Sequence, residues 1–148
     1  MNVVALSANS SAHDLKTLMT DKRQTRICLI DDDIYVRDAL AIGLRDAGYD
    51  VTTAPGAVAG LDHLMHAGAD AIITDMSMPG TDGATLISQV RTAWPQMPII
   101  AISGASQIEG RDMVEVARES GASAILAKPF RVLEMVALLR RLVSSDVP

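Results

Sequence analysis

Five short apolar runs recur along this chain, and a segment with helical spacing of its apolar residues follows each run. The runs occupy residues 26–30, 49–54, 71–74, 98–102 and 124–127. The helical segments occupy about 34–47, 57–66, 83–93 and 107–120, and a last one extends from beyond Pro129 to about 144. Strands that alternate with helices over short connections predict a parallel sheet with helices on both faces.

The handedness of the connections restricts the order of the strands. Crossovers between parallel strands are right-handed, which leaves few topologies for five strand–helix units. We therefore predict an α/β protein of the flavodoxin-like (βα)5 type, with a five-stranded parallel sheet in the order 2-1-3-4-5. In this order the first, third, fourth and fifth strands are neighbours, and the second strand lies at an edge.

Composition indicates a globular protein and argues against several classes of partner. Of the 148 residues 49% are hydrophobic and 3% are aromatic, and the net charge is -5. The acidic balance argues against direct nucleic-acid binding, which requires clustered Lys and Arg. No apolar run approaches the ~20 residues of a membrane span and no secretory signal is recognisable, so we expect a cytoplasmic protein with no membrane partner. The lone cysteine, Cys28, is expected to be a small buried hydrophobic residue.

The chain length predicts one domain, and the strand–helix alternation sets its bounds. Residues 1–24 are polar and precede the alternation, so we expect a flexible N-terminal extension there. Residues 25–145 form the expected domain, and residues 146–148 form a C-terminal tail.

Four of the five apolar runs end in polar residues. Asp31 and Asp32 follow the first run, Asp75 the third, Ser103 the fourth and Lys128 the fifth. In a parallel sheet these ends meet at one edge, where open α/β proteins bind their ligands. Three carboxylates at one place would repel one another unless a cation neutralises them, and Mg²⁺ prefers such oxygen ligands.

This set of side chains fits the chemistry of phosphoryl transfer. One carboxylate can attack phosphorus and form an acyl phosphate, while the cation and Lys128 neutralise charge on the phosphoryl oxygens. The Ser103 hydroxyl can donate to a further oxygen, although turns favour serine for other reasons as well. Asp33 is interpreted as the cap of the following helix rather than as a metal ligand.

The same segments resemble the receiver domain of two-component response regulators, over residues of about 25–145. Residues 27–33 resemble its opening strand with an acid pair, and 73–83 its phosphoacceptor segment. Residues 98–104 resemble the strand with the switch hydroxyl, and 121–130 the lysine segment, whose Lys–Pro bond is usually cis. The implied roles are metal-binding acids at Asp31 and Asp32, phosphoacceptor and metal ligand at Asp75, a metal ligand at the Ser77 backbone carbonyl, a hydroxyl donor at Ser103 and a charge-neutralising lysine at Lys128.

The resemblance implies a signalling protein that catalyses only its own phosphorylation and dephosphorylation. Its expected partners are a histidine kinase or histidine phosphotransfer protein upstream and a protein target downstream. The sequence leaves a homodimer open.

One position departs from the family pattern, and a second bears on the lifetime of the phosphate. Ile125 stands where the family usually carries a Tyr or Phe that changes rotamer on phosphorylation. Coupling through an aromatic ring is therefore not expected. Ala105 is small, which implies an acyl phosphate open to water and fairly rapid phosphate loss.

Three other functions remain open from the residues alone. The chain could be the N-terminal receiver of a larger regulator with a separate output module. It could be a phosphohydrolase of the haloacid dehalogenase type, using Asp31 and Asp33 on the first strand, although the late acidic pair of such enzymes is not found. It could also be a pseudo-receiver that only binds proteins, an alternative against which the intact acid set argues.

Overall fold

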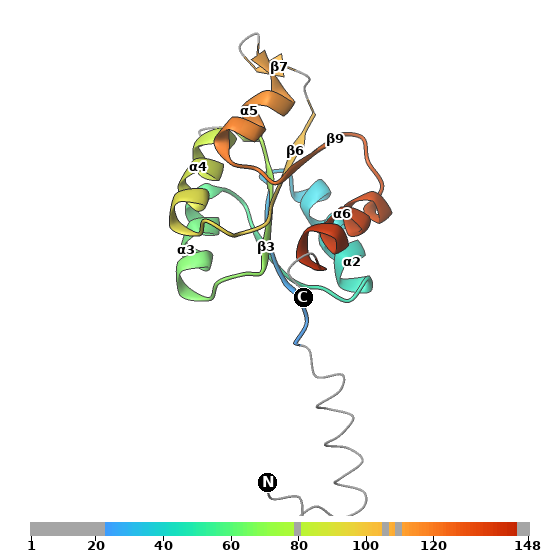
Figure 1. Ribbon diagram of the computed structural model, residues 1–148. Coiled ribbons are helices and arrows are strands. Elements are labelled where there is room, and N and C mark those ends of the chain that lie inside the picture. The colour runs from blue at the N-terminus through green and yellow to red at the C-terminus, as the bar shows by residue number, and fades with distance from the viewer. Residues whose placement is uncertain (1–22, 79–80, 105–106, 109–110, 145–148) are drawn as a thin grey trace, which may run out of the picture.

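The computed structural model describes residues 23–78, 81–104, 107–108 and 111–144, so the predicted N-terminal extension lies almost wholly outside the described residues. The centre of the fold is a parallel sheet (Figure 1) made of β1 (Arg26–Ile30), β2 (Asp50–Ala54), β3 (Ala71–Asp75), β6 (Ile99–Ser103) and β9 (Ala124–Ala127). Their order is β2-β1-β3-β6-β9. Counted along the chain, the parallel strands follow the order 2-1-3-4-5, and the predicted flavodoxin-like fold is confirmed. The labels skip because short strands outside this sheet are numbered among them.

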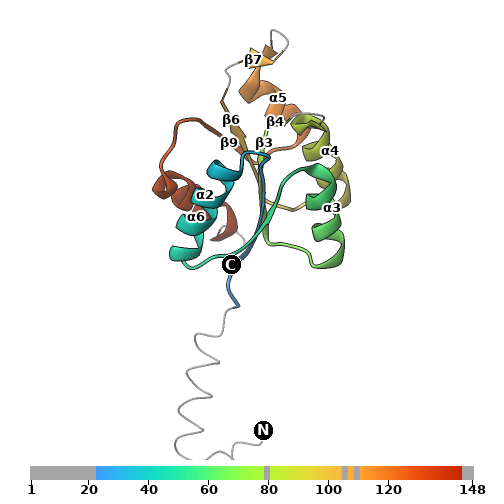
Figure 2. The ribbon, with the colours of Figure 1, turned by 180° about the vertical axis from the view of Figure 1, so that it is seen from behind.

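Helices cover both faces of the sheet (Figures 1 and 2). One face carries α2 (Ile34–Asp46) and α6 (Val132–Ser144), and the other carries α3 (Ala57–His66), α4 (Gly83–Ala93) and α5 (Met113–Ser120). The bounds of α2, α3 and α4 agree with the predicted helices to within one residue. No helix in this described part of the chain combines the length and apolar character needed to cross a membrane.

Each face of the sheet buries its own apolar core, because successive strand residues point to opposite sides. In β1, Ile27 and Leu29 belong to the core under α2 and α6, whereas Cys28 and Ile30 belong to the core under the other three helices. Cys28 is fully buried as predicted, and burial raises the pKa of its thiol to about 11. The two cores hold the strands from both sides and keep their carboxyl ends in fixed register.

The helix predicted from residue 107 begins later, at Met113. Before it, β7 (Gln107–Ile108) and β8 (Arg111–Asp112) form a short antiparallel pair. The Asp112 side chain accepts a hydrogen bond from a backbone amide of the first turn and so caps α5. The predicted start was wrong because Asp112, which directly precedes the apolar residues of this helix, is its cap.

A second short antiparallel pair, β4 (Ser77–Met78) and β5 (Thr81–Asp82), lies between β3 and α4. Directly after it, Gly83 approaches the backbone of Met76 closely. A Cβ at Gly83 would lie 2.6 Å from the Cα and 2.7 Å from the carbonyl oxygen of Met76. Only a glycine fits here without displacing the backbone that follows β3.

We expect Gly83→Ala to lower the free energy of unfolding by about 1–3 kcal/mol, because the added methyl group overpacks against backbone atoms that cannot move freely. Urea denaturation monitored by circular dichroism measures this. Gly56→Ser is the matched control: no atom lies within 4 Å of the Cβ it would add, and serine is a favoured residue at this N-cap of α3. Equal unfolding midpoints for Gly83→Ala and the parent would contradict the close contact.

Candidate functional site

Strand register brings the four polar strand ends to one edge of the sheet. The residue before Asp31 pairs with the residue before Asp75 across β1 and β3, so these two aspartates lie next to each other. Asp75 in turn pairs with the residue before Ser103. Ser103 pairs with the residue before Lys128. The predicted convergence of these side chains therefore follows from the pairing of the strands themselves.

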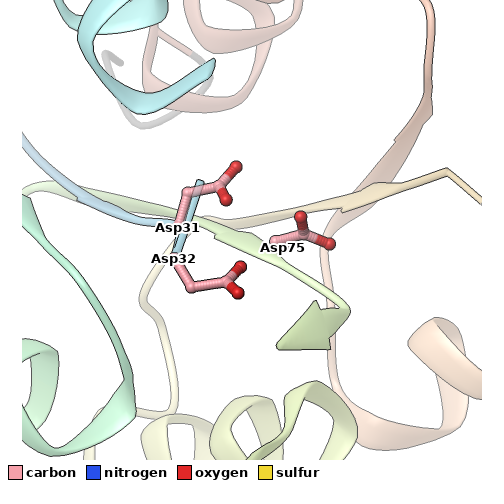
Figure 3. Close-up of side chains that lie close together, drawn as sticks. All are labelled: Asp31, Asp32 and Asp75. Carbon is pink, nitrogen blue, oxygen red and sulfur yellow. The ribbon is translucent and has the colours of Figure 1, made fainter. Parts of the chain in front are cut away.

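Three carboxylates meet at this edge. Asp31, Asp32 and Asp75 each offer an oxygen atom, and these oxygens all lie within 4.8 Å of one another. Figure 3 shows Asp31 and Asp32 extending from the end of β1 on the same side as Asp75, which ends β3. Asp31 and Asp75 are buried, whereas Asp32 is exposed. The cluster is thus open to solvent on one side only.

Asp31 is held by the backbone around it and is fully buried. Its Oδ1 accepts a hydrogen bond of 2.9 Å from the amide of Asp33. Its Oδ2 accepts none from the described residues. Burial raises the pKa of Asp31, and the neighbouring carboxylates of Asp75 and Asp32 raise it further, against the opposing effects of the Asp33 amide and Lys128. A buried carboxylate oxygen without a donor is a position where a cation would be favourable.

Asp75 is paired with a lysine. The Lys128 ammonium donates a hydrogen bond of 2.9 Å to Oδ2, and the amide of Ser77 donates one of 2.8 Å to Oδ1. Partial burial would lower the pKa of Lys128, but the bond to Asp75 and the charges of Asp75, Asp31 and Asp33 raise it above its usual value. Lys128 therefore stays protonated and cationic at neutral pH. The peptide bond between Lys128 and Pro129 is cis, as the family resemblance implied.

The two serines of the predicted site are also placed beside it. Ser103 is the last residue of β6 and is buried, and its carbonyl accepts the amide of Lys128 at 2.8 Å. Ser77 follows Asp75 by two residues and contacts its carboxylate through the backbone amide. The roles of the Ser103 hydroxyl and of the Ser77 carbonyl stay predictions.

Asp33 caps α2, as predicted. Its Oδ1 accepts hydrogen bonds from the amides of Tyr35 at 2.9 Å and Val36 at 3.3 Å. This carboxylate is engaged at the start of the helix and is not part of the three-carboxylate cluster found among the described residues.

Sequence reasoning missed Arg37, which lies in the first turn of α2. Its guanidinium donates a hydrogen bond of 3.0 Å to the backbone carbonyl of Asp31. No motif or spacing pointed to this contact, because an arginine near the start of an amphipathic helix usually lies in solvent.

The donor set suits a hard divalent cation better than a soft one. All three side chains offer carboxylate oxygens, one of which is buried without a hydrogen-bond donor among the described residues. Mg²⁺ usually binds through one or two carboxylates together with phosphate oxygens and keeps several waters, and the exposed position of Asp32 leaves solvent access for them. The residues present therefore fit the ion that the sequence predicted.

Residues 27–140 match the response regulator receiver domain family. The chain belongs to this family. This receiver domain is 32% identical over 123 residues to the response regulator MprA of Mycobacterium sp. strain KMS, covering 83% of this chain and 52% of the relative. It is 33% identical over 118 residues to the DNA-binding transcriptional regulator NtrC of Escherichia coli K12, covering 80% of this chain and 24% of NtrC.

Solved structures agree with the assignment. The chemotaxis response regulator CheY4 of Vibrio cholerae superposes with a TM-score of 0.72 at 28% identity, covering 81% of this chain and 99% of that one. A putative response regulator from Chloroflexus aurantiacus superposes with a TM-score of 0.75 at 31% identity, covering 82% and 99%. The chain spans about half the length of the MprA relatives that it matches.

Ile125 lies in β9, half-buried beside a pocket of about 220 Å³ between this strand and α5. The aliphatic side chain packs against the core under α3, α4 and α5. The receiver domain thus has no aromatic ring at this position. Ala105, from which the sequence predicts an acyl phosphate open to water, lies outside the described residues.

The buried carboxyl of Asp31 is expected to make stability fall as the pH rises. Its raised pKa means that the native state holds the proton more tightly than the unfolded chain, so this contribution is present at low pH and lost above the folded pKa. Without divalent metal, we expect Asp31→Asn to raise the free energy of unfolding at neutral pH, because the substitution removes a buried charge. The gain should shrink at acid pH, as the natural carboxyl becomes protonated.

Asp70, at the opposite edge of the sheet, provides the control of opposite sign. Partial burial would raise its pKa, but hydrogen bonds from the backbone and guanidinium of Arg26 lower it overall. The ionised Asp70 therefore stabilises the folded state at neutral pH, and this stabilisation is lost as the pH falls through the pKa of the folded protein. Asp70→Asn should accordingly lower the free energy of unfolding most at neutral pH. Urea denaturation in EDTA at both pH values tests the pair. A loss of stability in Asp31→Asn at neutral pH would contradict the account of Asp31.

Proposed function

We propose that this chain is a phosphoacceptor receiver that takes a phosphoryl group on Asp75, in a Mg²⁺-dependent reaction, from a histidine kinase or histidine phosphotransfer protein. The observation that supports the proposal is that one carboxylate lies next to both a lysine ammonium and two other acids. Asp75 contacts the Lys128 ammonium at 2.9 Å and has an oxygen within 4.8 Å of those of Asp31 and Asp32. Asp75 is therefore the carboxylate that has both a cationic side chain and the predicted metal-binding acids beside it.

In the proposed reaction an oxygen of Asp75 forms a bond to the phosphorus of a phosphohistidine. The phosphorus–nitrogen bond breaks, and its electron pair goes to the imidazole. Lys128 remains protonated and neutralises charge on the transferred group, while the Ser103 hydroxyl donates to another phosphoryl oxygen. Mg²⁺ held by Asp31, Asp32, Asp75 and the Ser77 carbonyl would offset the repulsion between the acids and the phosphoryl group.

The environment of each acid favours Asp75 over Asp31 as the nucleophile. Asp31 is fully buried, and burial raises its pKa, which favours the protonated, less nucleophilic form in the absence of a cation. The contact with Lys128 supports Asp75 instead. A phosphohydrolase of the haloacid dehalogenase type would need its nucleophile on the first strand, so steady hydrolysis of phosphate esters lost in Asp31→Asn and retained in Asp75→Asn would favour that alternative.

The surface beside Lys128 supports a protein as the phosphodonor. A pocket of about 370 Å³ opens between α2 and the segment that follows Lys128. Apolar groups predominate in its lining, and Tyr35 of α2 and Leu133 of α6 are largely exposed on the two helices that border it. An exposed apolar surface next to charged reactive groups fits the docking of a partner's side chains. The pocket is lined by Val36, Ala39, Leu40, Lys128, Pro129, Phe130 and Val132.

The functional unit in this proposal extends over residues 25–145. Because its phosphoryl group would come from a histidine kinase, we place it in the cytoplasm, with no direct contact to nucleic acid or membrane. The relatives MprA and NtrC are longer than this chain, which supports the alternative that it is the receiver part of a larger regulator. Phosphorylation would then change the affinity for a downstream protein target or for a second copy of the chain.

We expect acetyl phosphate with Mg²⁺ to add one phosphoryl group to the natural chain and none to Asp75→Asn, because the substitution removes the nucleophilic oxygen. Intact-mass spectrometry measures the product directly. Asp33→Asn is the control, since that side chain caps α2 and should leave labelling intact. Equal labelling of Asp75→Asn, or unchanged labelling in excess EDTA, would contradict the proposal.

The docking surface gives a separate prediction. Ala39→Asp places a charge in the apolar pocket beside Lys128, and we expect about tenfold slower transfer from a phosphorylated histidine kinase of the source organism, because burying an unpaired charge is unfavourable. The rate with acetyl phosphate should not change. Ala59→Asp, on the opposite face of the sheet, is the control. Equal transfer rates for all three proteins would exclude this pocket as the docking site.

A further inference from the structure

The side chain of Arg37 is largely buried beside the acid cluster, and among the described residues it makes no hydrogen bond or ion pair with the carboxylates that form the cluster. Its side chain is 15% exposed, and it donates a hydrogen bond of 3.0 Å to the backbone carbonyl of Asp31. The nearest carboxylate to its Nε is that of Asp38, at 4.0 Å, too far for a hydrogen bond. The Nε is buried without a hydrogen-bond partner among the described residues.

Burying a guanidinium is unfavourable unless the charge is paired and its donors are hydrogen-bonded. An ion pair does not explain the burial, because the Asp38 carboxylate is largely exposed and lies at the distance limit. The bond that Arg37 makes to the site goes to a backbone carbonyl and not to a carboxylate, so its effect on the site concerns the position of the backbone.

The hydrogen bond acts on the peptide that joins two acids of the cluster. A peptide group is planar, so holding the carbonyl oxygen of Asp31 also fixes the direction in which the chain enters Asp32. The other side of Asp31 is held as well, because its amide donates to the carbonyl of Ala54 at 3.1 Å and its Oδ1 accepts the amide of Asp33. With these contacts made, the buried Oδ2 of Asp31 is left facing no donor among the described residues.

We propose that Arg37 is a positioning residue for the metal site, which holds the Asp31–Asp32 peptide so that both carboxylates face one cation. The inference rests on the proposed Mg²⁺-dependent function. A charged donor suits this task, because charge-assisted hydrogen bonds are shorter and stronger than neutral ones. Outer contacts of this kind commonly change metal affinity by about 10–100-fold when they are removed.

The same helix supplies a matched control. Arg45 donates to the backbone carbonyl of Val51 at 2.9 Å, also across six residues, but at the other end of α2 and away from the acids. Loss of either arginine removes one hydrogen bond from a guanidinium to a backbone carbonyl next to α2. Only the loss of Arg37 changes the support of the acid cluster.

The test compares Arg37→Met, Arg37→Lys and Arg45→Met with the parent. Isothermal titration calorimetry gives the Kd for Mg²⁺, thermal denaturation gives Tm without metal, and initial phosphorylation by acetyl phosphate is followed over a range of Mg²⁺ concentrations. We expect Arg37→Met to raise the Kd about tenfold and to slow phosphorylation at low Mg²⁺, with recovery at saturating Mg²⁺. Arg37→Lys keeps one cationic donor and should fall between the parent and Arg37→Met. Arg45→Met should lower Tm but leave the Kd unchanged.

An unchanged Kd in folded Arg37→Met would overturn the inference, as would an equal rise in Arg45→Met. Should Arg37→Met fail to fold, Arg37→Gln is measured with the same expectation and the same criteria. A parent chain that neither binds Mg²⁺ nor is labelled on Asp75 would overturn the proposed function and this inference together. A parent that does both, with no change in the Arg37 variants, would overturn this inference alone.

Discussion

Repulsion between three carboxylates is the constraint on which the rest of this structure depends. At oxygen–oxygen separations of at most 4.8 Å, each charged pair repels by about 3 kcal/mol or more at the effective dielectric of a protein surface. The single hydrogen-bonded ammonium, that of Lys128, contacts Asp75 and not the other two acids in the described contacts. Strand ends that were free to separate would relieve this repulsion. A sheet held between two apolar cores keeps them together instead.

Chemically similar acids differ in character here because their surroundings differ. Asp31 is buried against a backbone amide, Asp32 lies in solvent, and Asp75 contacts a lysine. The backbone determines much of this difference, since the amides that follow Asp31 and Asp75 by two residues donate to the carboxylates themselves. The end of a strand and the turn after it therefore decide how each acid can react.

Local pattern and chain handedness were sufficient to predict the sheet order and the meeting of Asp31, Asp75, Ser103 and Lys128, because strand ends follow directly from strand register. The cap at Asp33 was equally predictable, since capping depends on residues adjacent in sequence. The start of α5 was not, because the short β7–β8 pair before it depends on backbone pairing that apolar spacing does not indicate. Arg37 escaped prediction because its partner is a backbone carbonyl, which is the same for every residue type. The individual roles in the site came from resemblance, and geometry alone does not separate a metal ligand from a neighbouring acid.

The burial of Cys28 has a practical consequence for spectroscopy. This is the only thiol of the chain, it is fully buried in β1, and its pKa of about 11 leaves almost no thiolate at neutral pH. Thiolate is the form that reacts with maleimides and related labels. A cysteine introduced at an exposed position would therefore be labelled selectively in the otherwise natural sequence, and a fluorophore or spin label placed there would report local movement without background from a second attachment point.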